Sequence, residues 1–182
     1  MSLNRWHYFL NLEQDFVRTL EFVEFDKNNE KAFSNEYAKV LLLAGSEVDV
    51  VAKLVCGKYA PKQKADNIED YRKAIVSTFK DIHTISIDIS RHNLSLTPWT
   101  NWNPSIAKSP DWWQAYNSVK HDREKCFPEA NLANTINSLC GLFALLLYIF
   151  KDEKHPHPYP EFLDYGFPEY IVTAGGRKLP GT

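Results

Sequence analysis

The stretch that decides the fold is residues 109–150, which read SPDWWQAYNSVKHDREKCFPEANLANTINSLCGLFALLLYIF. The Ser-Pro-Asp start at 109–111 predicts a helix, because Ser accepts hydrogen bonds from free amides, Pro suits the first helical position and Asp complements the dipole. Apolar spacing extends this helix to about Cys126. Pro128 predicts the start of a second helix that runs to about Phe150. These two helices predict a mainly α fold.

Three further segments, toward the N-terminus, support the same fold class. Apolar residues recur at spacings of three and four over 4–25 and 35–57, with a polar turn between them. An acidic pair three residues apart predicts a capping box at the start of a third helix over 66–82. Alternation over 84–89 and again over 94–96 predicts a short β-hairpin, with an extended loop as the alternative.

The chain as a whole is predicted to be one domain over residues 1–182, an antiparallel bundle of about five helices. No internal repeat or flexible linker divides it. Residues 154–182 hold five of the ten prolines. We therefore expect this tail to pack on the bundle as irregular chain.

Composition and charge exclude several classes of protein. A hydrophobic fraction of 44% and a charged fraction of 24% exclude disorder and collagen. The formal charge of -2 and the pI near 6.3 predict no global attraction to nucleic acid, so any such contact must be local. The three cysteines are far apart and odd in number, and are expected to be reduced.

The chain shows no sign of export or membrane insertion. Its longest apolar run, 139–150, has 12 residues, whereas a membrane span needs about 20. The N-terminus lacks the basic-then-apolar layout of a signal peptide. We expect a cytoplasmic protein with no membrane partner.

The helix predicted over 109–126 has a polar stripe between its apolar and solvent faces. At 100° per residue the stripe carries an aromatic ring, an amide, an ammonium group and an imidazole: Trp113, Asn117, Lys120, His121 and Glu124. Such an edge is either a solvated boundary or a site. Asn117, Lys120 and His121 are the candidate catalytic cluster.

Glu47 is the main anomaly in the helix predicted over 35–57. It falls in the middle of an apolar arc formed by Val40, Leu43, Ala44, Val51 and Leu54. A buried carboxylate is costly unless it is paired or hydrogen-bonded. We therefore expect it to contact Lys120, His121 or Arg123, in a pair that is either structural or tunes a functional imidazole.

Other patterns argue against common kinds of site. Asp49 projects to the side opposite Glu47, four residues before Lys53, and is interpreted as a surface residue. The sequence lacks a Gly-rich phosphate loop, a nucleophile elbow and HExxH, which removes the common NTPase, hydrolase and metalloprotease interpretations. No metal site and no cofactor are expected.

The segment WWQAYNSVKHDR at 112–123, followed by a long apolar helix, resembles the HEPN-like superfamily, the nucleotide-binding domains named for higher eukaryotes and prokaryotes. The signature of that superfamily is Arg, a polar residue and, a few residues later, a His that faces a cleft. Asn117 matches the polar residue and His121 the His, whereas Tyr116 stands at the Arg position. The resemblance implies a helical bundle, frequent homodimers, and components of phage defence or toxin–antitoxin systems.

In the ribonucleases of the superfamily, the resemblance implies that Arg and His act together on the scissile phosphate. Because a tyrosine cannot neutralise a phosphate, Lys120 or Arg123 would have to supply the charge. The first alternative is therefore a metal-independent endoribonuclease in which His121 handles the proton of a ribose 2'-hydroxyl. The second alternative is a structural dimerisation domain.

We favour a third interpretation over these two alternatives: a non-catalytic or regulatory domain that binds a nucleotide, RNA or a protein partner. Trp113 offers a stacking face in this interpretation. Tyr116, Arg123 and Glu47 complete the expected ligand-binding set.

Overall fold

The fold of the computed structural model is described for residues 3–152, 156–165 and 178–182. Its centre is the pair α2 (Asn35–Tyr59) and α6 (Leu132–Phe150), which make the most extensive contact between helices. Almost every residue of α6 is buried, so this helix forms the middle of the core. The mainly α fold class is confirmed.

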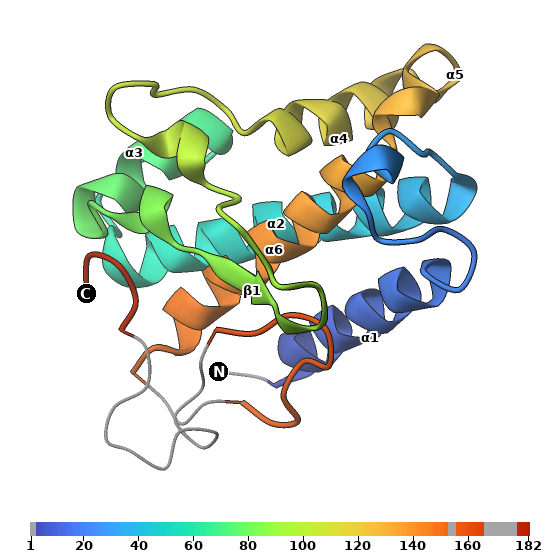
Figure 1. Ribbon diagram of the computed structural model, residues 1–182. Helices are drawn as coiled ribbons and strands as arrows, with labels where there is room; N and C mark the ends of the chain where they lie inside the picture. The colour runs from blue at the N-terminus through green and yellow to red at the C-terminus, as the bar shows by residue number, and fades with distance from the viewer. Residues whose placement is uncertain (1–2, 153–155, 166–177) are drawn as a thin grey trace.

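Three other helices pack against this pair. α1 (Asn4–Thr19) packs against α2 and α6, α3 (Ile68–Thr78) packs against α2, and α4 (Asp111–His121) packs against α2 and α6. The short α5 (Arg123–Cys126) follows α4. In Figure 1, α1 and α4 lie on opposite sides of α2. This placement decides which face of α2 each of them covers.

The described part of the chain contains one helix, α6, that is long and apolar enough to span a membrane by length and composition. Within the fold, 83% of its most apolar window is buried. Packing inside the core therefore accounts for its apolarity.

Several predicted helix ends are wrong because the capping residues lie elsewhere. The helix predicted over 109–126 is broken at Asp122, whose backbone leaves the helical region and whose carboxylate accepts from the amide of Lys125. α6 begins at Leu132 rather than at Pro128, because the side chain of Asn131 caps it. The acidic capping box predicted for the third helix is replaced by Asn67, which accepts from two amides of the first turn.

The predicted hairpin is confirmed. β1 (Ile87–Ile89) pairs antiparallel with β2 (Leu94–Leu96), in the register Ile87↔Leu96. The backbone φ of 49° at Asn93 lies in the left-handed region, which Asn tolerates better than most residues. The two Ile side chains of β1 are buried, so the hairpin closes over the core.

The described tail residues 156–165 pack against α1. The indole Nε1 of Trp6 donates to the carbonyl oxygen of Pro158 at 2.7 Å. Asp164 forms an isolated antiparallel bridge with Asp88 of β1. The rest of the predicted tail, except 178–182, lies outside the described residues.

The three cysteines are free, in agreement with the expected reduced thiols. Cys56 and Cys140 are buried, and Cys126 is half-buried at the end of α5.

Candidate functional site

Two aromatic side chains of α4 pack on two glycines of the central helices. A Cβ atom built on Gly45 of α2 would overlap the ring of Tyr116, and one built on Gly141 of α6 would lie 2.7 Å from Trp112. Only a glycine allows such a close approach of ring and backbone. α4 is therefore held at a fixed rotation, which decides where its polar stripe points.

The stripe contributes to a cavity of about 530 Å³ between α2, the start of α3 and α4. Four residues of α4 line it: Trp113, Tyr116, Asn117 and Lys120. The opposite walls come from α2 and from the start of α3: Ser46, Asp49, Val50, Lys53, Asp66, Asn67 and Ile68. The volume lies within the range of about 300–1,000 Å³ that is usual for small-molecule sites.

The rotation of α2 explains which of its residues reach this cavity. Asp49 is four residues beyond Gly45, or about 40° around the helix, so it faces α4 as Gly45 does. Asp49 is therefore a cavity residue and not simply a surface residue. Its predicted contact with Lys53 is present, with Nζ and Oδ2 2.6 Å apart.

Asp49 is also bound by a second donor, the hydroxyl of Tyr71, at 2.7 Å. The hydroxyl and Lys53 occupy different oxygens of the carboxylate. Burial, and then the hydrogen bond to Asp49, raise the pKa of Tyr71 above its ordinary value, so the hydroxyl stays a neutral donor. On this wall of the cavity, both oxygens of the Asp49 carboxylate therefore already accept a hydrogen bond from the protein.

Lys120 differs from Lys53, because it has no carboxylate partner among the described residues. Its Nζ lies 5.5 Å from the ring centroid of Tyr116, in a cation–π contact. Next to it, Asn117 donates from Nδ2 to the carbonyl oxygen of Trp113 at 2.9 Å. The Oδ1 atom of Asn117 has no hydrogen-bond partner in the described ranges, so it can accept from a ligand.

The two rings that line the cavity are mostly covered. Trp113 is 7% exposed and Tyr116 5% exposed. The expectation that Trp113 offers an open stacking face is therefore wrong, because the ring packs against Tyr116 and Trp112. Sequence periodicity placed Trp113 on the helix edge but could not show which neighbours cover it.

His121 and Arg123 do not line this cavity. His121 is five residues beyond Tyr116, about 140° around the helix, and its side chain is exposed. Arg123 follows the break at Asp122, donates to Oδ1 of Asn35 at 2.7 Å and lies over the ring of Phe127. Of the three candidate catalytic residues, Asn117 and Lys120 therefore line the cavity, whereas His121, one turn beyond Asn117 on the same helix, does not.

The partner predicted for Glu47 is wrong. Its side chain is only 13% exposed, as expected, but it accepts from Nη1 of Arg5 on α1 at 2.5 Å. Glu47 is two residues beyond Gly45, about 200° around α2, so it faces away from α4, and its contact with Arg5 shows that it faces α1. It therefore reaches none of the basic residues of α4.

Sequence reasoning missed Glu13, which is 2% exposed and accepts three backbone amides of the tail. The N–H groups of Glu161, Phe162 and Leu163 lie 2.9–3.0 Å from its carboxylate oxygens. The sequence does contain a feature that could have identified Glu13 as buried, because it stands within the apolar stripe of α1 between Phe9 and Phe16. Glu13 holds the tail against α1 through these hydrogen bonds and does not line the cavity between α2, α3 and α4.

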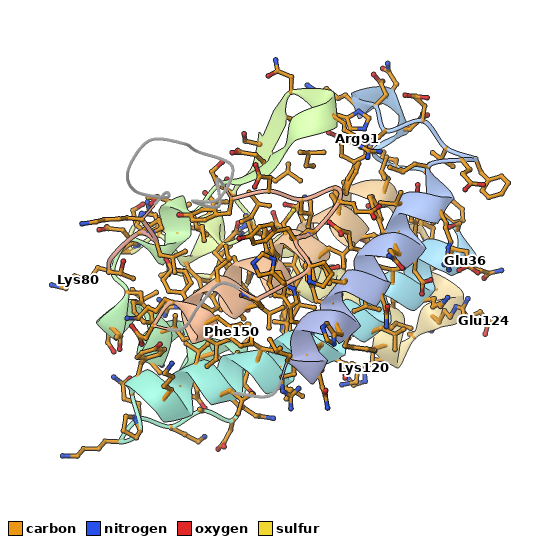
Figure 2. All side chains as sticks on the ribbon, turned by 90° about the horizontal axis from the view of Figure 1, so that it is seen from below. Glu36, Lys80, Arg91, Lys120, Glu124 and Phe150 are labelled. Carbon is orange, nitrogen blue, oxygen red and sulfur yellow. The ribbon has the colours of Figure 1, made fainter. Side chains whose placement is uncertain are left out.

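A second cavity, of about 560 Å³, lies between the hairpin, residues 25–30 and the start of α6. Its walls are mainly apolar, and the polar stripe of α4 contributes no described residue to it. Figure 2 places Lys120 at the opposite edge of the molecule from Arg91, which lies in the turn of the hairpin. The two cavities are therefore separate, and only the first combines the predicted polar residues.

No protein-family model matches this chain, and no curated protein and no solved structure matches it significantly.

Proposed function

We propose that this chain is a HEPN-like domain that binds a nucleotide, or one nucleotide unit of an RNA, in the cavity between α2, α3 and α4. The observation that carries this proposal is Lys120, a cavity residue that has no carboxylate partner among the described residues. An uncommitted ammonium group at a cavity wall attracts an anion such as a phosphate. Asn117 and the covered rings supply a hydrogen-bond acceptor and an apolar wall for the remainder of the ligand.

The arrangement supports binding more than catalysis. General acid–base chemistry needs the imidazole within hydrogen-bond reach of the proton that it moves. His121 is exposed and lies outside the lining of the cavity. Tyr116, at the Arg position of the family signature, is fixed on Gly45 and brings no charge.

The size of the cavity and the burial of its rings favour a single nucleotide unit over an extended strand. Sequence-independent binding of single strands uses exposed aromatic faces on which successive bases stack. Trp113 and Tyr116 are both buried and leave little ring surface open for stacking. An RNA is therefore proposed to insert one unit rather than to lie along the surface.

Calorimetric titration of the purified protein tests the proposal. The ligands are the four ribonucleoside monophosphates and a short single-stranded RNA, all in EDTA. We expect at least one of them to bind, and Lys120→Ala to weaken that binding about tenfold, as for loss of a charged hydrogen bond. Lys125→Ala is the matched control, because Lys125 pairs with Asp122 on α5 and is 83% exposed. Absence of binding by all five ligands, or equal loss in both variants, would contradict the proposal.

The ribonuclease alternative is separated from binding by the same RNA incubated in EDTA. Binding without cleavage, unchanged by His121→Ala, supports the non-catalytic domain. Cleavage that disappears in His121→Ala would contradict the non-catalytic interpretation and support metal-independent catalysis by His121. Asn117 would then need a role in orienting the RNA.

A homodimer and a place in phage defence or a toxin–antitoxin system belong to the same proposal. The resemblance supports both, and exposed aromatic rings at Phe22 and Phe33 are compatible with a protein contact. Sedimentation at tens of micromolar tests the dimer, and a monomer there would remove it. A neighbouring antitoxin-like gene would favour the toxin–antitoxin setting.

A further inference from the structure

The cavity between α2, α3 and α4 carries a balanced set of charges. Two lysines and two aspartates line it: Lys53, Lys120, Asp49 and Asp66. Their formal charges cancel, which is unusual for a site that must hold several phosphate groups. The distribution of these charges limits which anion the cavity can accept.

The two lysines differ, because only Lys120 has no ion pair among the described residues. Lys53 is 2.6 Å from Asp49, and both oxygens of that carboxylate already have a donor. Lys120 lies over Tyr116 and has no ion pair within the described ranges. An incoming phosphate group therefore meets a single uncommitted cation.

The start of α3 adds the negative charge of Asp66 to the cavity. The first-turn amides of Glu69 and Asp70 already donate to Oδ1 of Asn67, so this helix end does not offer those amides to an anion. Asp66 stands at the cavity edge with its side chain 71% exposed. Its carboxylate lies 3.3 Å from Lys64, which does not line the cavity.

We infer that the ligand of this cavity is a nucleoside carrying one phosphate group, either free or as the phosphorylated end of an RNA. This inference rests on the proposed function. Lys120 binds that single phosphate, and Asp66 repels the additional negative charges of a polyphosphate. The nucleoside part lies against Asn117, Trp113 and Tyr116.

The test compares the monophosphate, diphosphate and triphosphate of one nucleoside by calorimetry in EDTA at about 0.1 M salt, where exposed charges still interact over about 10 Å. We expect the monophosphate to bind about tenfold more tightly than the triphosphate. Asp66→Asn should narrow this ratio by about threefold, the size of an exposed charge effect. Glu124→Gln removes the same charge from α5, outside the cavity lining, and should leave the ratio unchanged.

Two RNA samples identify the source of the phosphate. A short single-stranded RNA with a terminal monophosphate is compared with the same RNA after dephosphorylation. Tighter binding of the phosphorylated RNA than of the free nucleotide supports an RNA end, and the reverse order supports a free nucleotide.

Equal or tighter binding of the triphosphate would overturn the inference and leave the proposed function standing. Equal binding of the phosphorylated and dephosphorylated RNA, at an affinity above that of the monophosphate, would also overturn it. If no nucleotide and no RNA binds, the proposed function itself fails.

Discussion

Two glutamates, Glu13 on α1 and Glu47 on α2, both interrupt an apolar stripe, yet the fold treats them differently. Glu13 is 2% exposed and is satisfied by three backbone amides of the tail. Glu47 keeps 13% of its side chain exposed and pairs with Arg5, itself 35% exposed. A carboxylate on an apolar stripe thus indicates that a donor is needed, while the segment packed above it decides which donor is used.

The two environments also differ in electrostatics. Burial raises the pKa of Glu13, and the hydrogen bonds from Leu163, Glu161 and Phe162 oppose this rise without cancelling it. Backbone amides supply dipoles but no full positive charge, unlike the guanidinium of Arg5 beside Glu47. The stability contribution of Glu13 should therefore depend on pH.

The largest effect is expected for Glu13→Ala. Its loss leaves three amides without acceptors next to the core, at about 1–3 kcal/mol for each buried group left unsatisfied. We expect the free energy of unfolding in urea to fall by about 3 kcal/mol. Glu13→Gln keeps one acceptor oxygen and should lose less. A loss below about 1 kcal/mol in Glu13→Ala would mean that the tail detaches without cost to the bundle.

A smaller effect is expected for Gly45→Ala, two residues from Glu47. An added methyl group overlaps the ring of Tyr116 and must displace α4, at about 2 kcal/mol, the usual cost of overpacking. Gly57→Ala is the matched control on the same helix, because nothing lies within 4 Å of its Cβ position. The control should gain about 0.5 kcal/mol from helix propensity. Similar values for both variants in urea unfolding would refute the fixed rotation of α4.

The pH dependence of Glu13 should be weaker still, because the backbone hydrogen bonds oppose the rise that burial causes in its pKa. Because its pKa is higher in the folded state than in the unfolded state, the folded state binds more protons between the two values. The stability contribution of this proton is complete below the unfolded pKa and is lost as pH rises through the folded pKa. Unfolding of the wild type relative to Glu13→Gln, measured from pH 4 to 7, should show this loss. A difference that stays constant across this range would exclude it.

The smallest effect is expected for Glu47→Ala, below about 1 kcal/mol, because a partly exposed ion pair contributes little. Arg5→Ala should cost about the same. A double-mutant cycle with both substitutions should return a coupling energy below about 1 kcal/mol. A coupling as large as the Glu13→Ala effect would erase the contrast between the two glutamates.

Much of the fold was predictable from local patterns. Periodicities of 3.6 and 2 residues located the helices and the hairpin, because apolar side chains must share one face to be buried together. Helix ends were less predictable. Asn131 rather than Pro128 marks the start of α6, and Asp122 ends a helix that the apolar pattern continues. The candidate site was predicted in part: Asn117, Lys120, Trp113 and Tyr116 meet in one cavity, whereas His121, Arg123 and Glu47 do not.

By itself, the sequence determined the mainly α fold, the polar stripe of α4 and the need of Glu47 for a partner. Periodicity places each side chain at an angle around its own helix axis. Only the tertiary structure decided that α4 covers the Gly45 side of α2 while α1 covers the Glu47 side. That choice depends on which helices pack together, and packing is set by contacts between residues far apart in the chain. For the same reason Glu13 gained its three amides from residues about 150 positions away.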